Sequence, residues 1–352
     1  MAYLEYENIG ITAMSAAVPK RVINNLQYTE HFSTEEVKDI VEKVGIYERR
    51  FVDDSTCSSD LCYAAAEKLI ADNGVNREEI DLLIFISQTP DYRMPATAII
   101  LQERLGLPKK TIAFDLILGC SAFLYGLSIV YGFMQSNNLR KALILDGETR
   151  SKVYSPKDRR CAFLFGDGGI AALVEKNENF KKSYFSLNSD GSREDLIKID
   201  GGGYRIPSSI ETLQEKVVDE YGNIRNDEQG YMNGADVFNF VISEIPKDLK
   251  GIIEFANVNK DDFKFVVFHQ ANGFINKHLA KKLKISPERI PSTINKFGNT
   301  SSVSIPLTIV SELKDKLQGD NLVLMSAFGV GMTWASAVVN FKDCKISEIV
   351  EV

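Results

Sequence analysis

The feature that most constrains the fold of this 352-residue chain is an internal repeat at about half its length. The helix-like segment LSIV at 127–130 recurs as LTIV at 307–310. The strand-like segment ALIL at 142–145 recurs as LVLM at 322–325. In both pairs the second copy begins 180 residues after the first, at 307 against 127 and at 322 against 142. A fixed spacing of this kind is typical of a duplicated structural unit.

A third pair of segments supports the duplication. Residues 77–86, REEIDLLIFI, resemble residues 260–269, KDDFKFVVFH, in having charged residues followed by a buried-strand pattern. Chance similarity among apolar segments is the alternative, but it does not explain a strand, a helix and a strand in one order. We therefore expect two similar halves, residues 1–176 and 177–352.

The expected strands and helices indicate an α/β fold. LLIFIS, ALILDG, FVVFH and LVLMS are continuous apolar runs, which is how strands covered on both faces read. Helical spacing of apolar residues occurs over 58–73, 121–136 and 304–318. The tract 175–235 is less regular, and we expect it to form strands or loops over the catalytic face. The sheets should therefore lie between layers of helices.

Composition and charge exclude several classes of protein. A formal net charge of -7 argues against nucleic acid as a partner, because that binding depends on clustered Lys and Arg. There is no basic segment followed by an apolar one at the start, and no run of eighteen apolar residues. Five cysteines without a C-x-x-C pair favour a reducing compartment over disulfides or a zinc ribbon. We expect a soluble cytoplasmic protein with no membrane partner and no metal.

Cys120 is the first candidate functional residue. In FDLILGCSAFLYGL an apolar strand runs through Gly119 into the start of a helix. The positive end of a helix dipole stabilises a thiolate, so a cysteine there is a better nucleophile. A buried, inert thiol is the commoner role for a lone cysteine. The other cysteines lack this context and are expected to be packing or surface thiols: Cys57, Cys62, Cys161 and Cys344.

His269 and Asn299 are expected to share a site with Cys120. His269, one of three histidines, ends the strand FVVFH, and ligands in open α/β sheets gather beyond the carboxyl ends of strands. Asn299 lies one residue from the position 180 residues after Cys120, so it should occupy the matching elbow of the second copy. Taken singly, a core histidine and a turn or helix-capping asparagine remain open.

Four segments together resemble a known family. DLILGCSAF, VFHQANGF, FGNTSS and SAFGVGMTW, in this order, are similar to the active-site segments of β-ketoacyl-[acyl-carrier-protein] synthase III, a thiolase-superfamily condensing enzyme. The resemblance runs almost from end to end. It implies a duplicated thiolase-like fold, layered α-β-α-β-α, in a homodimer. It also implies an acyltransferase of fatty acid biosynthesis that uses acyl-CoA or acyl-carrier protein substrates and no cofactor.

The resemblance assigns roles to the candidate residues. Cys120 is implied to accept the acyl group, while His269 and Asn299 polarise the malonyl thioester carbonyl during decarboxylation. Two hydrogen-bond donors near that oxygen are also what an enolate requires chemically. The backbone amides of Cys120 and Val330 are candidates for a second oxyanion hole. Val330 departs from the glycine usual in the family.

Other residues are implied to bind substrate. Phe328 and Gly329 lie in the same loop as Val330. Lys43 lies in VEKVGIYERRF, which resembles an early thioester-site segment. Arg159 matches a residue that flanks the adenine of coenzyme A, but Asp39 replaces the tryptophan expected on the other face. Because a carboxylate cannot stack, a carrier protein is an alternative acyl donor. Met94 matches a position that reaches into the neighbouring subunit's acyl tunnel.

A basic helix is implied to receive the carrier protein. The segment GFINKHLAKKLK presents Lys277, Lys281 and Lys282 together with Phe274, which departs from the basic residue expected there. Lysines on an exposed helical stripe are usually only a solvated face. Against an acidic chain, a basic patch favours the docking role modestly.

Rival functions remain open. The chain has no G-x-x-x-x-G-K-[ST], H-E-x-x-H or G-x-S-x-G motif. One rival is an acyltransferase that passes the acyl group from Cys120 to an alcohol, an amine or water. Another adds an acetyl carbanion to a ketone, as hydroxymethylglutaryl-CoA synthase does. A third is a non-catalytic scaffold, although a binding module has no need of Cys, His and Asn together.

Overall fold

The repeated segments form matching pairs of parallel strands in the computed structural model, which describes residues 2–136 and 138–352. In the first half, β5 (Leu82–Ile86) lies beside β7 (Lys141–Thr149), with Leu82 opposite Ala142. In the second half, β14 (Phe265–Phe268) lies beside β15 (Asp320–Gly329), with Phe265 opposite Val323. The duplication predicted from the 180-residue spacing is therefore present in the sheets.

The match continues through antiparallel neighbours. β7 pairs with β8 (Asp167–Lys176), which pairs with β2 (Ile9–Val18). In the same manner β15 pairs with β16 (Thr333–Lys342), which pairs with β9 (Ser183–Ser189). The first sheet has the order β17-β2-β8-β7-β5-β6 with β18 on β2, and the second has the order β1-β9-β16-β15-β14. The remaining sheet strands are β1 (Ala2–Tyr6), β6 (Ile112–Leu116), β17 (Lys345–Ile346) and β18 (Val350–Glu351).

The two ends of the chain cross between the halves. β1 pairs with β9 in the second sheet, while β17 and β18 pair with β2 in the first. The sheets otherwise follow the division at residue 176, which stays our proposal for the two halves. Each terminus thus ties one half to the sheet of the other.

Two helices fill the layer between the sheets. α4 (Ala122–Ser136) and α9 (Ser304–Leu313) contribute to one apolar cluster with residues from both sheets. Leu127 and Val130 of α4 are fully buried, as is Leu307 of α9. A helix that is apolar all round requires such a covered position. α9 ends at Leu313, earlier than the predicted residue 318.

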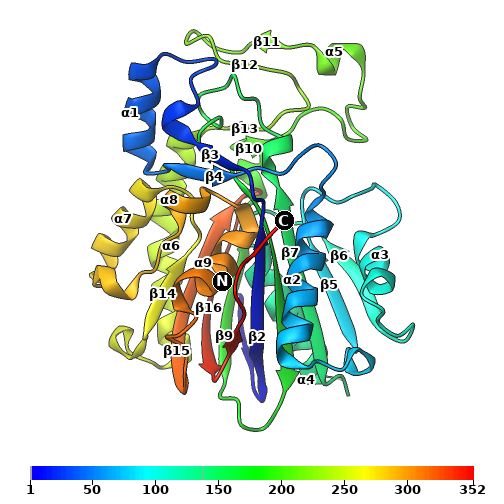
Figure 1. Ribbon diagram of the computed structural model, residues 1–352. Coiled ribbons are helices and arrows are strands. Elements are labelled where there is room, and N and C mark those ends of the chain that lie inside the picture. The colour runs from blue at the N-terminus through cyan, green and yellow to red at the C-terminus, as the bar shows by residue number, and fades with distance from the viewer. Residues whose placement is uncertain (1, 137) are drawn as a thin grey trace.

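Further helices cover the outer faces and complete the five layers (Figure 1). α2 (Ser58–Asn73) and α3 (Thr97–Arg104) pack on the first sheet, and α6 (Gly234–Ala256) packs on the second. α7 (Gly273–Leu283) packs beside α6 and buries Ile275 in the same outer cluster. The predicted layered α-β-α-β-α fold is confirmed. Among the residues described, no helix is both long and apolar enough to cross a bilayer.

Short elements form a cap beyond the sheets, at the top of Figure 1. α1 (Thr34–Val44) lies there, next to the hairpin of β3 (Val22–Asn24) and β4 (Glu48–Arg50). Much of the tract 175–235 also lies there, as predicted, although its first part is the long core strand β9. The other short elements are β10 (Ile197–Lys198), α5 (Ile210–Leu213), β11 (Lys216–Val217), β12 (Ile224–Arg225), β13 (Tyr231–Met232) and α8 (Ile294–Phe297).

The contact between α2 and β8 yields a stability prediction. A Cβ at Gly169 would lie 2.7 Å from Leu61 Cβ and 2.8 Å from the Cys62 backbone nitrogen. Because backbone cannot give way as a side chain can, Gly169→Ala should lower the free energy of unfolding by about 1–3 kcal/mol. Urea titration followed by circular dichroism measures it. Gly191→Ala, where a Cβ meets nothing within 4 Å, is the matched control. Equal effects from the two substitutions would contradict this packing argument.

Candidate active site

Cys120 lies at the turn between β6 and the first residue of α4. Its neighbour Gly119 and the loop residue Gly329 allow this turn to touch the end of β15. A Cβ on Gly329 would come within 2.7 Å of Cys120 Sγ, and a Cβ on Gly119 within 2.8 Å of Val330 Cβ. Both positions therefore need glycine for close approach. The Val330 side chain occupies the space over Gly119, and the Val330 backbone also hydrogen-bonds with the thiol.

Ser301 connects Cys120 to Asn299. The Ser301 hydroxyl lies 3.7 Å from Cys120 Sγ, and its backbone N–H donates to Asn299 Oδ1 at 2.9 Å. Ser301 has a φ of 56°, a left-handed conformation in a short 3-10 helix, η7 (Ser301–Val303). With Oδ1 occupied, the amide group Nδ2 of Asn299 is the end that donates, and it contacts the carbonyl of Ala271 at 3.4 Å. The second elbow thus meets the first, as the repeat predicted.

His269 directly follows β14 and is held by Ser304 at the start of α9. The His269 Nδ1 lies 2.6 Å from Ser304 Oγ, which also accepts from the Gln270 N–H at 3.3 Å. The Ser304 hydroxyl proton is therefore free to be donated to Nδ1, which leaves Nε2–H as the donor of the ring. Burial lowers the pKa of His269 to about 3, so its imidazole is neutral. A neutral ring that donates through Nε2 is suited to binding a carbonyl oxygen.

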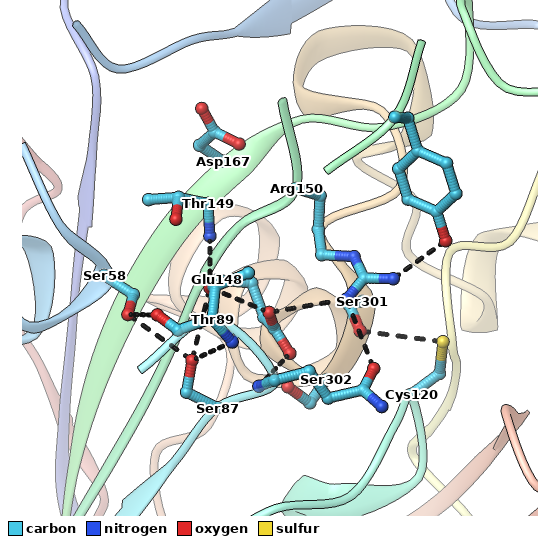
Figure 2. Close-up of polar contacts among 12 residues, drawn as sticks. Ser58, Ser87, Thr89, Cys120, Glu148, Thr149, Arg150, Asp167, Ser301 and Ser302 are labelled. Atoms are coloured by element: carbon cyan, nitrogen blue, oxygen red, sulfur yellow. Dashed lines mark hydrogen bonds and ion pairs between the residues drawn. The ribbon is translucent and has the colours of Figure 1, made fainter. Parts of the chain in front are cut away.

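Opposing effects act on the pKa of the Cys120 thiol. Burial raises the pKa of the Cys120 thiol, and the Arg150 cation and the Ser301 hydrogen bond act in the opposite direction. Burial prevails, which reverses the direction that the helix start alone was expected to give. Arg150 pairs with the buried Glu148 at 3.8 Å, and Figure 2 shows both near Cys120.

Four of these residues were not predicted from the sequence: Glu148, Arg150, Ser301 and Ser304. Glu148 and Arg150 could have been found from the sequence, because in LDGETR they directly follow a continuous apolar strand. A buried strand that ends in Glu-x-Arg places charges at the carboxyl edge where ligands gather. The two serines lie within FGNTSSVSIPL, beside Asn299. Nothing in that polar run distinguishes the serines that contact a catalytic candidate from those that do not.

Several predicted substrate residues gather at a surface cavity of about 590 Å³ between α1 and α7. Lys43, Phe274 and Lys277 all line it, together with Asn272, three residues after His269. Lys282 instead donates to the carbonyl of Ile242 on α6, and Lys281 is exposed outside the cavity lining. The structure therefore brings part of the predicted patch to the cavity.

The other predicted substrate residues lie apart from this cavity or are engaged elsewhere. Arg159 pairs with Glu36 of α1 at 3.3 Å and donates to the carbonyl of Tyr221 at 2.9 Å. Phe328 is buried and packs edge-on against the His269 ring, with 5.5 Å between centroids. Met94 is 81 % exposed, so it does not reach the site within its own chain.

Comparison with known proteins identifies the family. The family model for 3-oxoacyl-[acyl-carrier-protein] synthase III matches residues 114–191, and the model for its C-terminal part matches residues 253–341. The β-ketoacyl-[acyl-carrier-protein] synthase III of Aliarcobacter butzleri is 34% identical over 98% of this chain and 100% of the relative. That of Clostridioides difficile is 34% identical over 94% of this chain and 98% of its own.

A solved structure agrees with these relatives. The crystal structure of 3-oxoacyl-(acyl-carrier protein) synthase from Burkholderia xenovorans superposes with a TM-score of 0.93. It is 36% identical in sequence and covers 100% of this chain and 99% of its own. The resemblance inferred from four short segments is therefore confirmed over the whole length. The chain belongs to the 3-oxoacyl-[acyl-carrier-protein] synthase III family of condensing enzymes, which are acyltransferases.

Proposed function

We propose that Cys120 accepts an acyl group from an acyl thioester and that His269 and Asn299 then drive its decarboxylative condensation with a malonyl thioester. One observation supports this proposal: Ser301 contacts Cys120, Asn299 and His269, so the nucleophile and the two donors lie close together. The product is a 3-oxoacyl thioester. None of the steps below requires a metal or a redox cofactor.

The first step transfers the acyl group to the enzyme. The Cys120 sulfur attacks the thioester carbonyl, the bond to the carrier thiol breaks, and that thiol leaves with the proton that Cys120 gives up. We assign the backbone N–H groups of Cys120 and Val330 to the carbonyl oxygen that becomes negative. The close approach at Gly329 supports this assignment because it brings the loop against the sulfur.

The second step forms the carbon–carbon bond. The malonyl thioester oxygen accepts hydrogen bonds from His269 Nε2–H and Asn299 Nδ2–H while the bond to the carboxylate breaks and carbon dioxide leaves. The electron pair of that bond forms an enolate, whose carbon attacks the acyl carbonyl on Cys120. The tetrahedral intermediate then expels the Cys120 thiolate. Preorganised neutral donors stabilise the growing charge without having to reorient.

We propose that an acyl-carrier protein, rather than coenzyme A, delivers the first acyl group. Arg159, the predicted coenzyme A contact, is paired with Glu36, and Lys43, a predicted substrate residue, is paired with Asp39 at 2.6 Å, so both charges are partly neutralised. A carrier protein instead can dock on the exposed lysines Lys277 and Lys281 of α7. Lys277 lines the surface cavity together with Asn272, three residues after His269, so we assign this cavity to the thioester-bearing arm of the carrier.

We propose a cytoplasmic homodimer. β6 is the edge strand of the first sheet, and an uncovered edge is a template for pairing with a second chain. Ile112 on this strand and Ile117 just after it are exposed, as is Met94. A second copy over this edge would cover these apolar side chains and bring Met94 to the neighbouring subunit. Five unpaired cysteine thiols fit a reducing compartment.

Substitutions of Cys120, His269 and Asn299 should block different steps of the reaction. Cys120→Ser should abolish the acyl-enzyme adduct, because a hydroxyl has no comparable anionic fraction at neutral pH. Asn299→Ala should keep the adduct but slow malonyl decarboxylation by about a hundredfold or more, the usual effect of losing one oxyanion donor. His269→Ala should behave like Asn299→Ala. Intact-protein mass follows the adduct, and carbon dioxide release follows decarboxylation.

Thermal melting provides the control that each variant is folded. Iodoacetamide labelling of Cys120 in Asn299→Ala shows that the nucleophile is intact. If a folded Asn299→Ala variant released carbon dioxide at the parent rate, condensation would be the wrong reaction. Acyl transfer from Cys120 to an alcohol, an amine or water would then take its place, whereas an unreactive Cys120 in the parent protein would favour a scaffold.

The two steps should also differ in their dependence on pH. The pKa of His269 is about 3, so the ring stays neutral and decarboxylation by the acylated enzyme should be flat between about pH 6 and pH 8. Acylation should rise throughout that range, because burial raises the thiol pKa of Cys120 and the thiolate fraction grows with pH. Single-turnover rates of each step test this. A fall in decarboxylation as pH rises past about 6.5 would indicate a protonated histidine instead.

Carrier docking on α7 predicts a selective loss. Lys277→Glu should raise the KM for malonyl-carrier protein about fivefold and the KM for malonyl-CoA less, since the carrier presents a larger acidic surface to α7 than the phosphates of coenzyme A do. Steady-state kinetics with both substrates measure the difference. Lys250→Glu, on the exposed face of α6, is the matched control. A similar rise for both substrates, or for both variants, would place docking elsewhere.

A further inference from the structure

Two buried arginines line one cavity near the proposed nucleophile. Arg49 is 2 % exposed and Arg150 is 5 % exposed. Both line a cavity of about 140 Å³. The other lining residues include two tyrosines, two serines and apolar side chains, and among the residues described no carboxylate lines it: Tyr28, Phe51, Ser151, Tyr154, Ser155, Pro156, Cys161, Ala162 and Phe165.

Arg150 has one nitrogen to spare. Its Nη2 donates to the Tyr154 hydroxyl at 2.8 Å, and its Nη1 donates to Gln88 Oε1 at 3.2 Å. Its carboxylate partner Glu148 is 3.8 Å away and already accepts from the Gln88 N–H and from Thr89 Oγ1. Within the described part of the chain, Nε has no hydrogen-bond partner. A buried guanidinium N–H without an acceptor is costly, so this group favours an additional acceptor.

Arg49 is also incompletely paired. Its Nε donates to Asn25 Oδ1 at 2.7 Å and its Nη1 to the carbonyl of Phe165 at 3.1 Å, while Nη2 has no partner in residues 2–136 and 138–352. Across the same residues Arg49 forms no ion pair. Asp167, a carboxylate that acts on its charge, already accepts from Val52 and Ser151. Burial without an ion-pair partner lowers the pKa of Arg49 to about 10.

The cavity wall therefore carries the positive charges of Arg49 and Arg150. The carboxylates that act on them, Glu148 and Asp167, do not line the cavity. Glu148 and Asp167 are both buried and directed to donors of the protein. In a medium of low dielectric constant, two cations that share a wall attract an anion placed between them. Two guanidinium groups in one cavity wall can together bind one carboxylate. An alkyl chain in the same place would leave both charges without a counter-ion.

Arg150 belongs to the cavity wall and also acts on the reacting sulfur. Arg150 is the cation that acts most strongly on the Cys120 thiol, and Figure 2 shows its guanidinium between Glu148 and the side of the site where Cys120 lies. The volume of about 140 Å³ has room for several water-sized groups. A carboxylate and one or two methylene groups fit such a space.

We propose that Arg49 and Arg150 form a subsite for the terminal carboxylate of the acyl group that Cys120 accepts. The acyl substrate class is thus a short dicarboxylic acyl thioester, attached to Cys120 by one end and held by the two arginines at the other. This inference rests on the proposed acylation of Cys120. It deepens that function by naming the class of acyl group.

Succinyl and butyryl thioesters test the subsite, because both acyl groups have four carbons and only succinyl ends in a carboxylate. Both are presented on the same acyl-carrier protein and, in a second series, on coenzyme A. Intact-protein mass over time gives the rate of adduct formation at Cys120. Succinyl should react about ten- to a hundredfold faster than butyryl, as expected for hydrogen bonds to a charged group. Arg150→Met and Arg49→Met should each lower this ratio by about tenfold, and Arg150→Lys should restore part of it.

Four controls keep the result interpretable. Arg225→Met removes a partly buried arginine that pairs with Asp158 and does not line the cavity, so the ratio should be unchanged. Thermal melting excludes unfolding. Iodoacetamide labelling reports the intrinsic reactivity of Cys120, which Arg150 also affects, and the ratio of two acyl groups cancels that effect. Free succinate added during butyryl transfer distinguishes a tethered carboxylate from a free one, because only the latter would slow the reaction at low millimolar concentration.

The outcomes separate this inference from the proposed function. An equal rate for succinyl and butyryl, or a ratio unchanged in both arginine variants, would overturn the subsite and leave acylation of Cys120 standing. Inhibition by free succinate without any succinyl preference would make the cavity a site for free carboxylates and would also overturn it. No adduct from either thioester, with Cys120 still reactive to iodoacetamide, would overturn the proposed function itself.

Discussion

The structure depends on two helices that share one buried apolar layer between the sheets. α4 begins at the elbow of Cys120, and α9 begins with Ser304, just after the elbow of Asn299. Both helices fill the same central layer, and the contact of Cys120 with Ser301 places their starting points at the same edge of it. The intervening 3-10 helix η7 contacts β7 and α4 and so closes the distance between the two copies. Packing of the core thus positions groups that lie about half a chain apart.

Burial then determines the chemical state of each group at that edge. Desolvation disfavours charge, so it raises the pKa of Cys120 and lowers that of His269. For His269 this favours the proposed role, because a neutral imidazole can donate a hydrogen bond to a carbonyl oxygen without first losing or gaining a proton. For Cys120 the same burial opposes thiolate formation, which the cation of Arg150 partly offsets. Arg150 therefore has two roles in this account: it stabilises the thiolate and it lines the carboxylate cavity.

The fold and the meeting of the Cys120 and Asn299 elbows could be predicted because both depend on periodic or repeated patterns, whereas the catalytic roles of Cys120, His269 and Asn299 stay predictions. Continuous apolar strands, a 180-residue spacing and a cysteine at a helix start can all be seen directly in the sequence. The layers and the matching elbows followed from them. Contacts such as those of Arg49 with Asn25 and Phe165 were out of reach, because they join segments from distant parts of the chain. The exchange of β1, β17 and β18 between the sheets was missed for the same reason. Short edge strands carry too few residues to show a pattern.

The two copies differ where the chemistry requires it. In the first copy, β6 runs beside β5 and leads directly to Cys120. In the second, β14 is the edge of its sheet in the part of the chain that the structure describes, and the residues before Asn299 form α8 instead. Asn299 consequently bonds across to the first half: its N–H donates to the carbonyl of Leu164, and its carbonyl accepts from Gly166. A strand would have kept Asn299 in its own sheet, whereas α8 lets the second elbow pack onto the first, where Ser301 connects Asn299 to the thiol.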